Sequence, residues 1–284
     1  MLLKVKPYVH AILTRFNVFN PGMNVRDPQN RLNLDWLDHR FKLFEEFCYP
    51  TVKEQTNQNF RWFVFFDEKT PKSYHSQIDK YRCWPNFIPV FLKVFDPESV
   101  CEILLSNIDS KPDYLITTLL DNDDAIHRHF VQSIQEAFTK FLKNGYDGKT
   151  PRFLNFTYGY VFDRIGNRLY AVRHWGNPFI SMIEKFHEIE TVYVRNHDEL
   201  YLINPVEQVK SLRAWMQVVH EMNALNTVYG IRVPLKKIEI GFSAIYGDII
   251  ANETKIELWI DKAFTILRAI VKAILKRLNH LGFE

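Results

Sequence analysis

The sequence predicts an α/β fold in which a mostly parallel sheet is flanked by helices. Apolar strands alternate with amphipathic helices along the first half of the chain, a pattern typical of a doubly wound sheet. The runs FRWFVFF (60–66) and YLITTLL (114–120) are largely apolar, as expected for strands buried on both faces. The 284 residues are 46% hydrophobic and 15% aromatic, which is enough apolar material for a substantial core.

The elements of the first half follow in order. A first strand is expected at Val9–Phe16, before the turn residues Asn20-Pro21-Gly22. Asp35 is the expected N-cap of a helix whose apolar residues recur at helical spacing as far as Phe47. The later elements are strands at Phe60–Phe66, Phe87–Phe95 and Tyr114–Leu120, and helices at Tyr74–Tyr81, Pro97–Asn107 and Ala125–Lys143.

The second half has a less regular pattern. Pro151–Phe162 and Arg168–Val172 are expected to form a strand pair around the turn Arg164–Asn167. A short strand is expected at Thr191–Val194, and a short helix or two at Val206–Asn223. The chain then divides into a catalytic domain, residues 1–235, and a C-terminal helical extension, residues 236–284, in which 256–283 has apolar residues at helical spacing.

Charge and cysteine content exclude several classes. The net charge is only +3 and the first two thirds carry no basic stripe, so no nucleic-acid partner is expected. Three cysteines without a CxxC pair fit a reducing compartment rather than a disulfide framework. The N-terminus has no long uncharged apolar run, so we expect a cytoplasmic protein, or one peripheral on the cytoplasmic face of the inner membrane.

An acidic cluster, Asp121-Asn122-Asp123-Asp124, follows the strand at 114–120 directly. Ligands of open α/β sheets bind at the carboxyl ends of strands. Three neighbouring carboxylates repel one another unless a cation neutralises them, and Mg²⁺ or Mn²⁺ prefers oxygen ligands and phosphates. The alternative is an ordinary loop that caps the following helix. The position between a buried strand and a long helix favours a metal site.

Several segments resemble a known family. ILTRFNV, WLDHRFKLFEEFCYPTVKEQTNQNFRWFVFFD, LLDNDDAIHRHFV and WMQVVHEMNALN occur in this order between residues 12 and 226. They resemble the putative rhamnosyltransferases of bacterial polysaccharide loci, which are GT-A-type enzymes with a Rossmann-like sheet. The acidic cluster is similar to the DxD motif of such enzymes. The resemblance implies a metal-dependent transfer, with inversion, of a sugar such as rhamnose from a dTDP- or UDP-linked donor to a glycan or lipid-linked glycan.

The resemblance also implies roles for individual residues. It makes Asp123 and the late His220 the ligands of Mn²⁺ or Mg²⁺, and imidazole suits Mn²⁺ better. The donor would be bound by residues at the ends of the first, second and fourth strands: Thr14, Arg15, Asn17, Asp67, Asp121, Asn122 and Asp124. For most of these the simpler interpretation is a turn or solvated residue, and Arg40, in the matching segment, is as easily a structural partner.

An inverting transfer needs a carboxylate that accepts the proton of the acceptor hydroxyl. Glu184 is the first candidate for this catalytic base and Asp163 the second, with Glu188 and Asp198 also available. Trp175, beside Gly176-Asn177, is a candidate sugar contact, whereas Trp62 within its apolar strand is expected in the core.

Two further questions stay open from the sequence. The C-terminal helix, apolar with Lys and Arg between, would suit a membrane interface, or would pack on the domain or on a second copy of the chain. The function has two alternatives to glycosyl transfer. One is a nucleotidyltransferase or phosphohydrolase with the same acidic metal site, and the other is a non-catalytic glycan-binding protein of the same fold.

Overall fold

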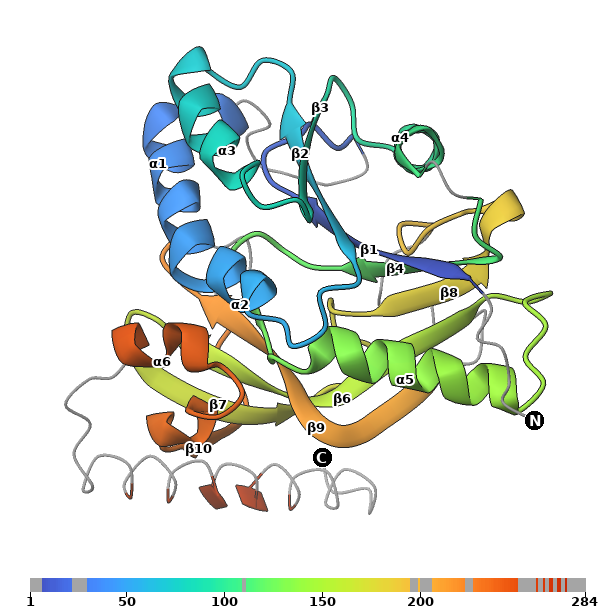
Figure 1. The fold of residues 1–284 in the computed structure, drawn as a ribbon. Helices are drawn as coiled ribbons and strands as arrows, with labels where there is room; N and C mark the ends of the chain where they lie inside the picture. Colours follow the sequence, from blue (N-terminus) through green and yellow to red (C-terminus); the bar gives the residue numbers. More distant parts are fainter. Residues whose placement is uncertain are drawn as a thin grey trace, which may run out of the picture.

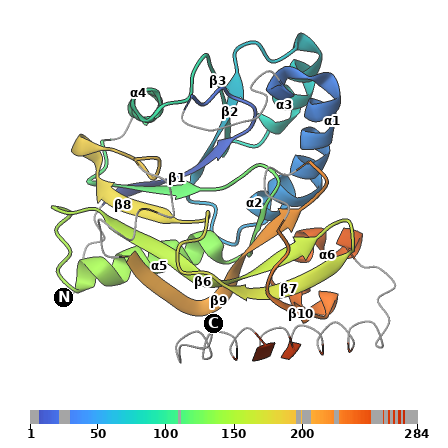
Figure 2. The same ribbon diagram turned by 180° about the vertical axis from the view of Figure 1, so that it is seen from behind.

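The computed structural model describes residues 7–21, 30–108, 111–194, 199, 206–222 and 227–249, with the single positions 259, 263, 266, 267, 270, 271 and 274. Within these ranges a mixed ten-stranded sheet runs through the molecule in the order β10-β7-β6-β8-β4-β1-β2-β3, and β9 pairs with β6 and β5. Helices lie against both faces of this sheet (Figures 1 and 2).

The first half of the sheet is parallel, as predicted. It contains β1 (Tyr8–Arg15), β2 (Arg61–Asp67), β3 (Phe87–Leu92) and β4 (Tyr114–Leu119), paired in the order β3-β2-β1-β4. Alternate side chains enter two separate cores, because successive residues of a strand face opposite sides of the sheet. Ile12 of β1 packs in one core and its neighbour Leu13 in the other.

Helices cover both faces of this parallel part. The first core is covered by α1 (Leu34–Leu43), η2 (Phe44–Cys48), α2 (Tyr49–Lys53), α3 (His75–Tyr81) and α5 (Phe130–Lys143), and the second by α4 (Pro97–Asn107). Short 3₁₀ turns lie at η1 (Asn30–Leu32), η3 (Lys72–Tyr74) and η4 (Phe186–Glu188). The cap of α1 is Asn33, whose side chain accepts a hydrogen bond from Trp36 N, and not Asp35 as expected.

The second half makes the sheet mixed rather than mostly parallel. Its strands are β5 (Ala125–Ile126), β6 (Arg152–Asp163), β7 (Arg168–Arg173), β8 (Ser181–Lys185), β9 (Val206–Val219) and β10 (Ile231–Val233). Strand β8 runs antiparallel to β4, and β6 pairs antiparallel with both β8 and β7. The predicted hairpin of β6 and β7 is confirmed.

Two predicted elements of this region were wrong: residues 206–219 form the long strand β9 rather than a helix, and residues 192–194 lie in a turn and bend. The helix predicted at Ala125–Lys143 is confirmed from Phe130 onward, after the short strand β5. Strand β9 pairs with β6 along one edge, and Trp215 becomes fully buried. Gly159 makes room for it, since a Cβ there would lie 2.2 Å from the ring. Tertiary pairing thus overrides the helical propensity of the segment.

A third core joins the end of the described chain to the sheet. Helix α6 (Ser243–Ile249) and the turn η6 (Leu235–Ile238) contribute Leu235, Ile238, Phe242 and Ile245 to it, against β6, β7 and β9. The predicted domain boundary at residue 235 therefore falls inside a packed core. The seven described positions from 259 to 274 are helical and exposed, and the rest of the predicted C-terminal helix lies outside the described residues. No helix within the described residues is long and apolar enough to span a bilayer.

Candidate active site

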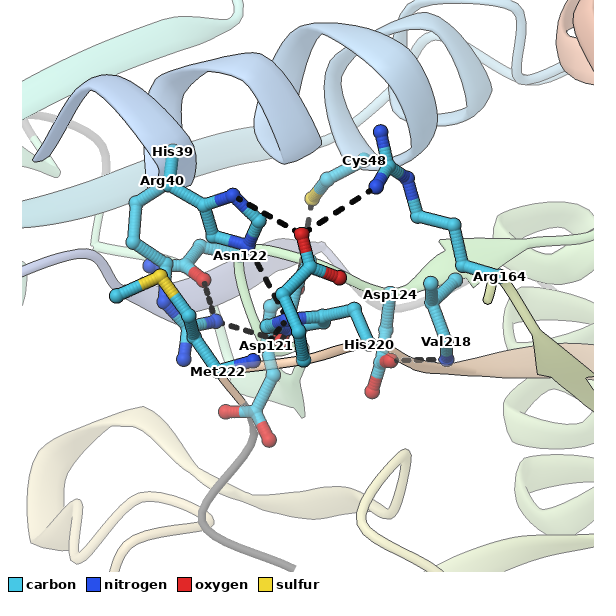
Figure 3. Close-up of polar contacts among 12 residues, drawn as sticks. His39, Arg40, Cys48, Asp121, Asn122, Asp124, Arg164, Val218, His220 and Met222 are labelled. Carbon is cyan, nitrogen blue, oxygen red and sulfur yellow. Dashed lines mark hydrogen bonds and ion pairs between the residues drawn. The ribbon is translucent and has the colours of Figure 1, made fainter. Parts of the chain in front are cut away.

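The acidic cluster lies where the sequence places it, at the carboxyl end of β4. Leu120 donates its backbone N–H to Leu13 O of β1, and the cluster follows directly. Helix α1 lies across from this loop, and the end of β9 completes the group (Figure 3). The side chains of Asp121, Asp123 and Asp124 nevertheless have three different environments.

Asp123 is buried and already neutralised within the protein. Its Oδ2 atom lies 2.6 Å from Nη1 of Arg40 and 2.9 Å from Nε2 of His220. Burial by itself would raise the pKa of Asp123, but the positive charge of Arg40 and the hydrogen bond from His220 outweigh it and hold the pKa well below its usual range. The same arginine donates to Oδ1 of Asn122 at 3.2 Å, so Arg40 fixes two residues of the cluster.

Asp124 is buried and joins the acidic cluster to strand β9. It is 4% exposed, and its Oδ1 accepts the backbone N–H of Val218 in β9 at 2.8 Å. Burial, with the charges of Asp123 and Asp121, raises the pKa of Asp124 well above its usual value. The side chain of Asn122 also contacts the backbone, since its Nδ2 donates to Phe16 O at 2.8 Å.

Asp121 is the carboxylate that faces solvent. Its side chain is 40% exposed and lies 4.0 Å from the guanidinium of Arg15. The guanidinium carbon of Arg15 lies 5.8 Å from the ring centre of Phe95 and 5.5 Å from that of Tyr193. Asp121 and Arg15 thus place one carboxylate and one guanidinium side by side at the ends of β4 and β1.

The other residues predicted to bind the donor lie at the ends of β1 and β2, but each has a structural partner. Thr14 Oγ1 accepts a hydrogen bond from Trp62 Nε1 at 2.9 Å inside the core. Asn17 Oδ1 accepts the backbone N–H of Asp67 at 3.2 Å. Asp67 is 1% exposed and paired with Arg31 at 2.9 Å. Trp62 is fully buried, as predicted.

The structure does not bring the predicted catalytic base to this group. Glu184 stands opposite Leu115 on β4, four residues before the end of that strand, or roughly 13 Å along it. The side chain of Glu184 is buried and accepts the backbone N–H groups of Glu190 and Thr191. Burial raises its pKa to about 7. Glu184 therefore anchors the 189–194 loop.

Asp163 lies closer to the cluster but faces a turn. It ends β6 opposite Val219 of β9, and its Oδ1 accepts the backbone N–H of Gly166 in the β6–β7 hairpin. Trp175 is 49% exposed and stacks with Arg173, whose guanidinium carbon lies 4.3 Å from its ring centre. Asp198, a further candidate base, lies outside the described residues.

A group of charged residues that was not expected from the sequence surrounds His220. His39 Nε2 lies 3.2 Å from His220 Nδ1, and His39 Nδ1 lies 3.7 Å from Glu221. Arg164 pairs with Glu46 at 3.0 Å and lies 3.7 Å from Glu221. A buried partner for Arg40 could have been predicted from the sequence. Arg40 lies at helical spacing with the apolar residues Trp36, Leu43 and Phe47, and a charged residue on a buried side of a helix needs a partner of opposite charge.

A group of possible metal ligands lies beside the acidic cluster. Within the described parts of the chain, one group of three combines ligand atoms within 4.8 Å of one another, namely His39, His220 and Glu221. Asp123 Oδ2 is instead shared by two hydrogen-bond donors. The imidazole donor set of this group fits a first-row transition ion, whereas Asp123 as a direct ligand stays a prediction.

The family described as "putative rhamnosyl transferase" matches residues 11–231. The chain belongs to this family, which confirms the resemblance seen in the sequence. The expected sheet with flanking helices is confirmed, except that the sheet is mixed rather than mostly parallel. No curated protein matches the chain.

Several solved structures share part of the fold at low identity. S. aureus TarS 1–349 is 11% identical, with 74% of this chain and 60% of that one covered and a TM-score of 0.40. A "putative nucleotide-diphospho-sugar transferase" from Desulfovibrio desulfuricans G20 is 9% identical, with coverages of 74% and 80% and a TM-score of 0.35. The 4-diphosphocytidyl-2C-methyl-D-erythritol synthase of Anaerococcus prevotii is 12% identical, with coverages of 91% and 96% and a TM-score of 0.34. The chain spans less than two thirds of the TarS structure, and likeness at this level identifies no activity.

Proposed function

We propose that the chain is a glycosyltransferase that moves a sugar from a nucleotide-diphosphate donor to a glycan or lipid-linked glycan. Its family makes rhamnose the expected sugar. The observation that carries the proposal is the pair of Asp121 and Arg15, at the carboxyl ends of β4 and β1. Ligands of open α/β sheets bind at this edge.

This pair suits a donor that has both hydroxyl groups and phosphates. A carboxylate accepts hydrogen bonds from the hydroxyls of a ribose or sugar, and a guanidinium binds phosphate oxygens in a planar fork. The guanidinium of Arg15 lies over the rings of Phe95 and Tyr193, which pack against each other, so its position is set before the donor arrives. A dTDP- or UDP-sugar offers both kinds of group.

Breaking the sugar–phosphate bond leaves negative charge on the diphosphate. Arg15 would stabilise part of that charge. The proposal also includes a divalent ion, Mn²⁺ or Mg²⁺, held through His220, which when bound supplies further positive charge to the leaving group. Arg40 acts indirectly, by keeping Asp123 ionised against His220.

The proposal assigns no catalytic base. Inversion requires a carboxylate within hydrogen-bond reach of the acceptor hydroxyl. Glu184 is buried on β8, beside β4, and accepts two backbone N–H groups, and Asp163 accepts a backbone N–H in the β6–β7 turn. Neither placement supports the role of catalytic base that was expected for it.

We also propose that the C-terminal segment binds a membrane surface. Six large apolar side chains of the C-terminal segment are between 47% and 72% exposed, and their spacing follows one side of a helix: Trp259, Ile266, Leu267, Ile270, Val271 and Ile274. Lys and Arg residues alternate with them in the sequence. A helix of this pattern binds the interface of an anionic bilayer, where a lipid-linked acceptor would be found.

A panel of nucleotide sugars tests the proposal. The full chain is mixed with dTDP-rhamnose, UDP-sugars, GDP-sugars or free nucleoside triphosphates, each with and without Mn²⁺. Thermal shift and release of the nucleoside diphosphate are then measured. Stabilisation and slow hydrolysis with one nucleotide sugar are expected. Pyrophosphate release from a triphosphate would favour a nucleotidyltransferase, and no response to any donor would refute the proposal.

A further inference from the structure

We infer that the 189–194 loop positions Arg15 for the donor, with Tyr193 as the residue that contacts the arginine and Glu184 as the anchor of the loop. The loop follows β8 and the turn η4, and Val192 packs in the second core. Tyr193 and Glu184 are positioning residues, which act on the donor through Arg15 and not by touching it. Only the effect on donor binding rests on the proposed function, since the position of Arg15 can be measured without a donor.

The start of the loop is held by side chains of two neighbouring strands. Oε2 of Glu184 accepts the backbone N–H of Glu190 at 2.8 Å, and Oε1 accepts that of Thr191 at 3.0 Å. The next residue, Val192, donates its N–H to Oγ1 of Thr117 at 2.9 Å. Glu184 lies in β8 and Thr117 in β4, and these strands are paired. Three successive N–H groups of the loop are thus fixed to the sheet.

The backbone of Thr191 turns the chain back toward β1. Thr191 is fully buried and has a φ of +66°, in the left-handed region that β-branched residues rarely adopt and keep only where their surroundings fix them. Its Oγ1 accepts the N–H of Tyr193 at 3.3 Å, and its carbonyl accepts that of Val194 at 3.1 Å. The hydroxyl of Tyr193 then donates to Leu13 O of β1 at 3.4 Å.

The ring of Tyr193 supports the guanidinium of Arg15. The guanidinium carbon lies 5.5 Å from the centre of this ring and 5.8 Å from that of Phe95. The two rings pack edge to face, with their centres 4.7 Å apart. Burial raises the pKa of Tyr193, the charge of Arg15 lowers it and that of Asp121 raises it. The hydroxyl of Tyr193 therefore lies close to both groups of the donor pair.

This support keeps Arg15 from closing on Asp121. The two side chains lie 4.0 Å apart, at the outer limit of an ion pair, and are 22% and 40% exposed. A guanidinium that could move would approach the carboxylate and bind it through two parallel hydrogen bonds, which would withdraw both groups from the donor. An arginine already held in place also loses less side-chain freedom on binding, which corresponds to roughly twofold to tenfold in affinity.

Calorimetric titration of the full chain with dTDP and with UDP tests the inference. Tyr193→Leu should weaken the binding of the diphosphate about fivefold to tenfold, whereas Tyr193→Phe, which keeps the ring, should stay within about twofold. Glu184→Gln loses one acceptor of the loop and should weaken binding less than Tyr193→Leu does. Tyr158→Leu is the matched control, at a half-buried tyrosine whose ring centre lies 5.4 Å from the guanidinium carbon of Arg213.

The same substitutions in an Arg15→Ala background separate positioning from a general disturbance of the site. If Tyr193 acts through Arg15, Tyr193→Leu costs no further affinity once the arginine is gone. A loss of equal size in both backgrounds would overturn the inference, and so would unchanged dTDP and UDP affinity in a folded Tyr193→Leu variant. Circular dichroism and thermal melts establish the fold, and Glu184→Gln provides the same cycle should Tyr193→Leu melt below the temperature of the titration.

NMR of the arginine side chains reads the position of Arg15 without a donor. Its Nε–H resonance, assigned through its loss in Arg15→Lys, should be displaced by the ring currents of Tyr193 and Phe95. In Tyr193→Leu it should move toward the value of an exposed arginine. An undisplaced resonance in the unaltered chain would overturn the positioning. If the resonance behaves as expected but no nucleoside diphosphate or nucleotide sugar binds, the positioning of Arg15 stands and the proposed glycosyl transfer fails.

Discussion

Arg40 and Asp123 form a buried ion pair, with Nη1 and Oδ2 2.6 Å apart and side chains 14% and 9% exposed. The arginine comes from helix α1 and the aspartate from the loop after β4, so the pair joins a surface helix to the centre of the candidate site. A negative charge at this depth needs a partner in the folded protein, because water does not solvate it.

Removing the arginine should therefore be costly. Arg40→Ala is expected to lower the free energy of unfolding by about 3 kcal/mol, since Asp123 stays buried with His220 as its remaining partner. Urea unfolding measures this. Arg40→Ala combined with Asp123→Asn should cost less than the sum of the single changes. Additive effects would show that the two side chains do not interact.

Asp121 is expected to matter for the donor and not for stability. Its side chain is 40% exposed, so Asp121→Asn should change the melting temperature of the free protein little while it lowers donor affinity about tenfold or more. Titration with the best nucleotide sugar of the panel measures the affinity. Asp147→Asn, at an exposed residue of the loop after α5, serves as control. Unchanged affinity in Asp121→Asn would remove this residue from the donor site.

Thr14 should behave in the opposite way. Thr14→Val removes the acceptor for Trp62 Nε1 and leaves a buried indole N–H without a partner. The expected cost is about 1–3 kcal/mol in unfolding free energy, with donor affinity unchanged. A large loss of donor affinity at normal stability would instead place Thr14 in the nucleotide pocket.

Glu184 predicts a dependence of stability on pH. Its pKa in the folded protein is about 7, against an ordinary value of 4.5, because burial disfavours the charged carboxylate. The folded state then holds a proton that the unfolded state loses, so the contribution of Glu184 is fully present below about pH 4.5 and is lost as pH rises through about 7.

Thermal melts between pH 5.5 and 8.5 test this point. The melting temperature of the unaltered chain should fall over this range more than that of Glu184→Gln, whose side chain does not titrate. The variant also loses one acceptor for the N–H groups of Glu190 and Thr191, which lowers its stability at every pH. Parallel pH profiles for the two proteins would mean that Glu184 does not titrate in this range.

Gly159 gives the sharpest test of strand β9. An added Cβ would lie 2.2 Å from the ring of Trp215, so Gly159→Ala is expected to destabilise the fold by about 1–3 kcal/mol through overpacking. Gly247→Ala, where a Cβ meets no atom within 4 Å, is the control. If the segment around Trp215 were the helix that its composition suggests, the alanine at 159 would meet no such obstacle.

Periodicity predicted the first half of the fold because the strands there are buried on both faces and the helices have one apolar side. Pro97–Asn107 was located to the residue. Strand β9 could not be found in this way. Its middle residues, Ala214, Trp215 and Met216, are all buried, so no alternation of apolar and polar side chains marks it, and its partner β6 is about fifty residues away in the chain.

For the site, the resemblance to the family implied that Asp123 and His220 lie together, and His220 does contact Asp123. Sequence reasoning could not show which acid faces solvent, because burial is set by α1 and β9 together. Nor could it show that Asp67 already has Arg31 as a partner. The place of Glu184 could not be predicted either, because it depends on the antiparallel register of β8 and β4.

The pairing of β9 with β6 also limits how the length of this chain can vary among its relatives. The backbone N–H of Val218 donates to Asp124, and His220, two residues later, forms a hydrogen bond with Asp123. Because side chains alternate along a strand, inserting or deleting one residue just before Val218 would turn the histidine away from the aspartate. An alignment of the family should therefore show no insertions or deletions between Trp215 and His220, although gaps are expected elsewhere. They should be tolerated earlier in β9, where register shifts opposite Phe156–Gly159 already accommodate extra residues.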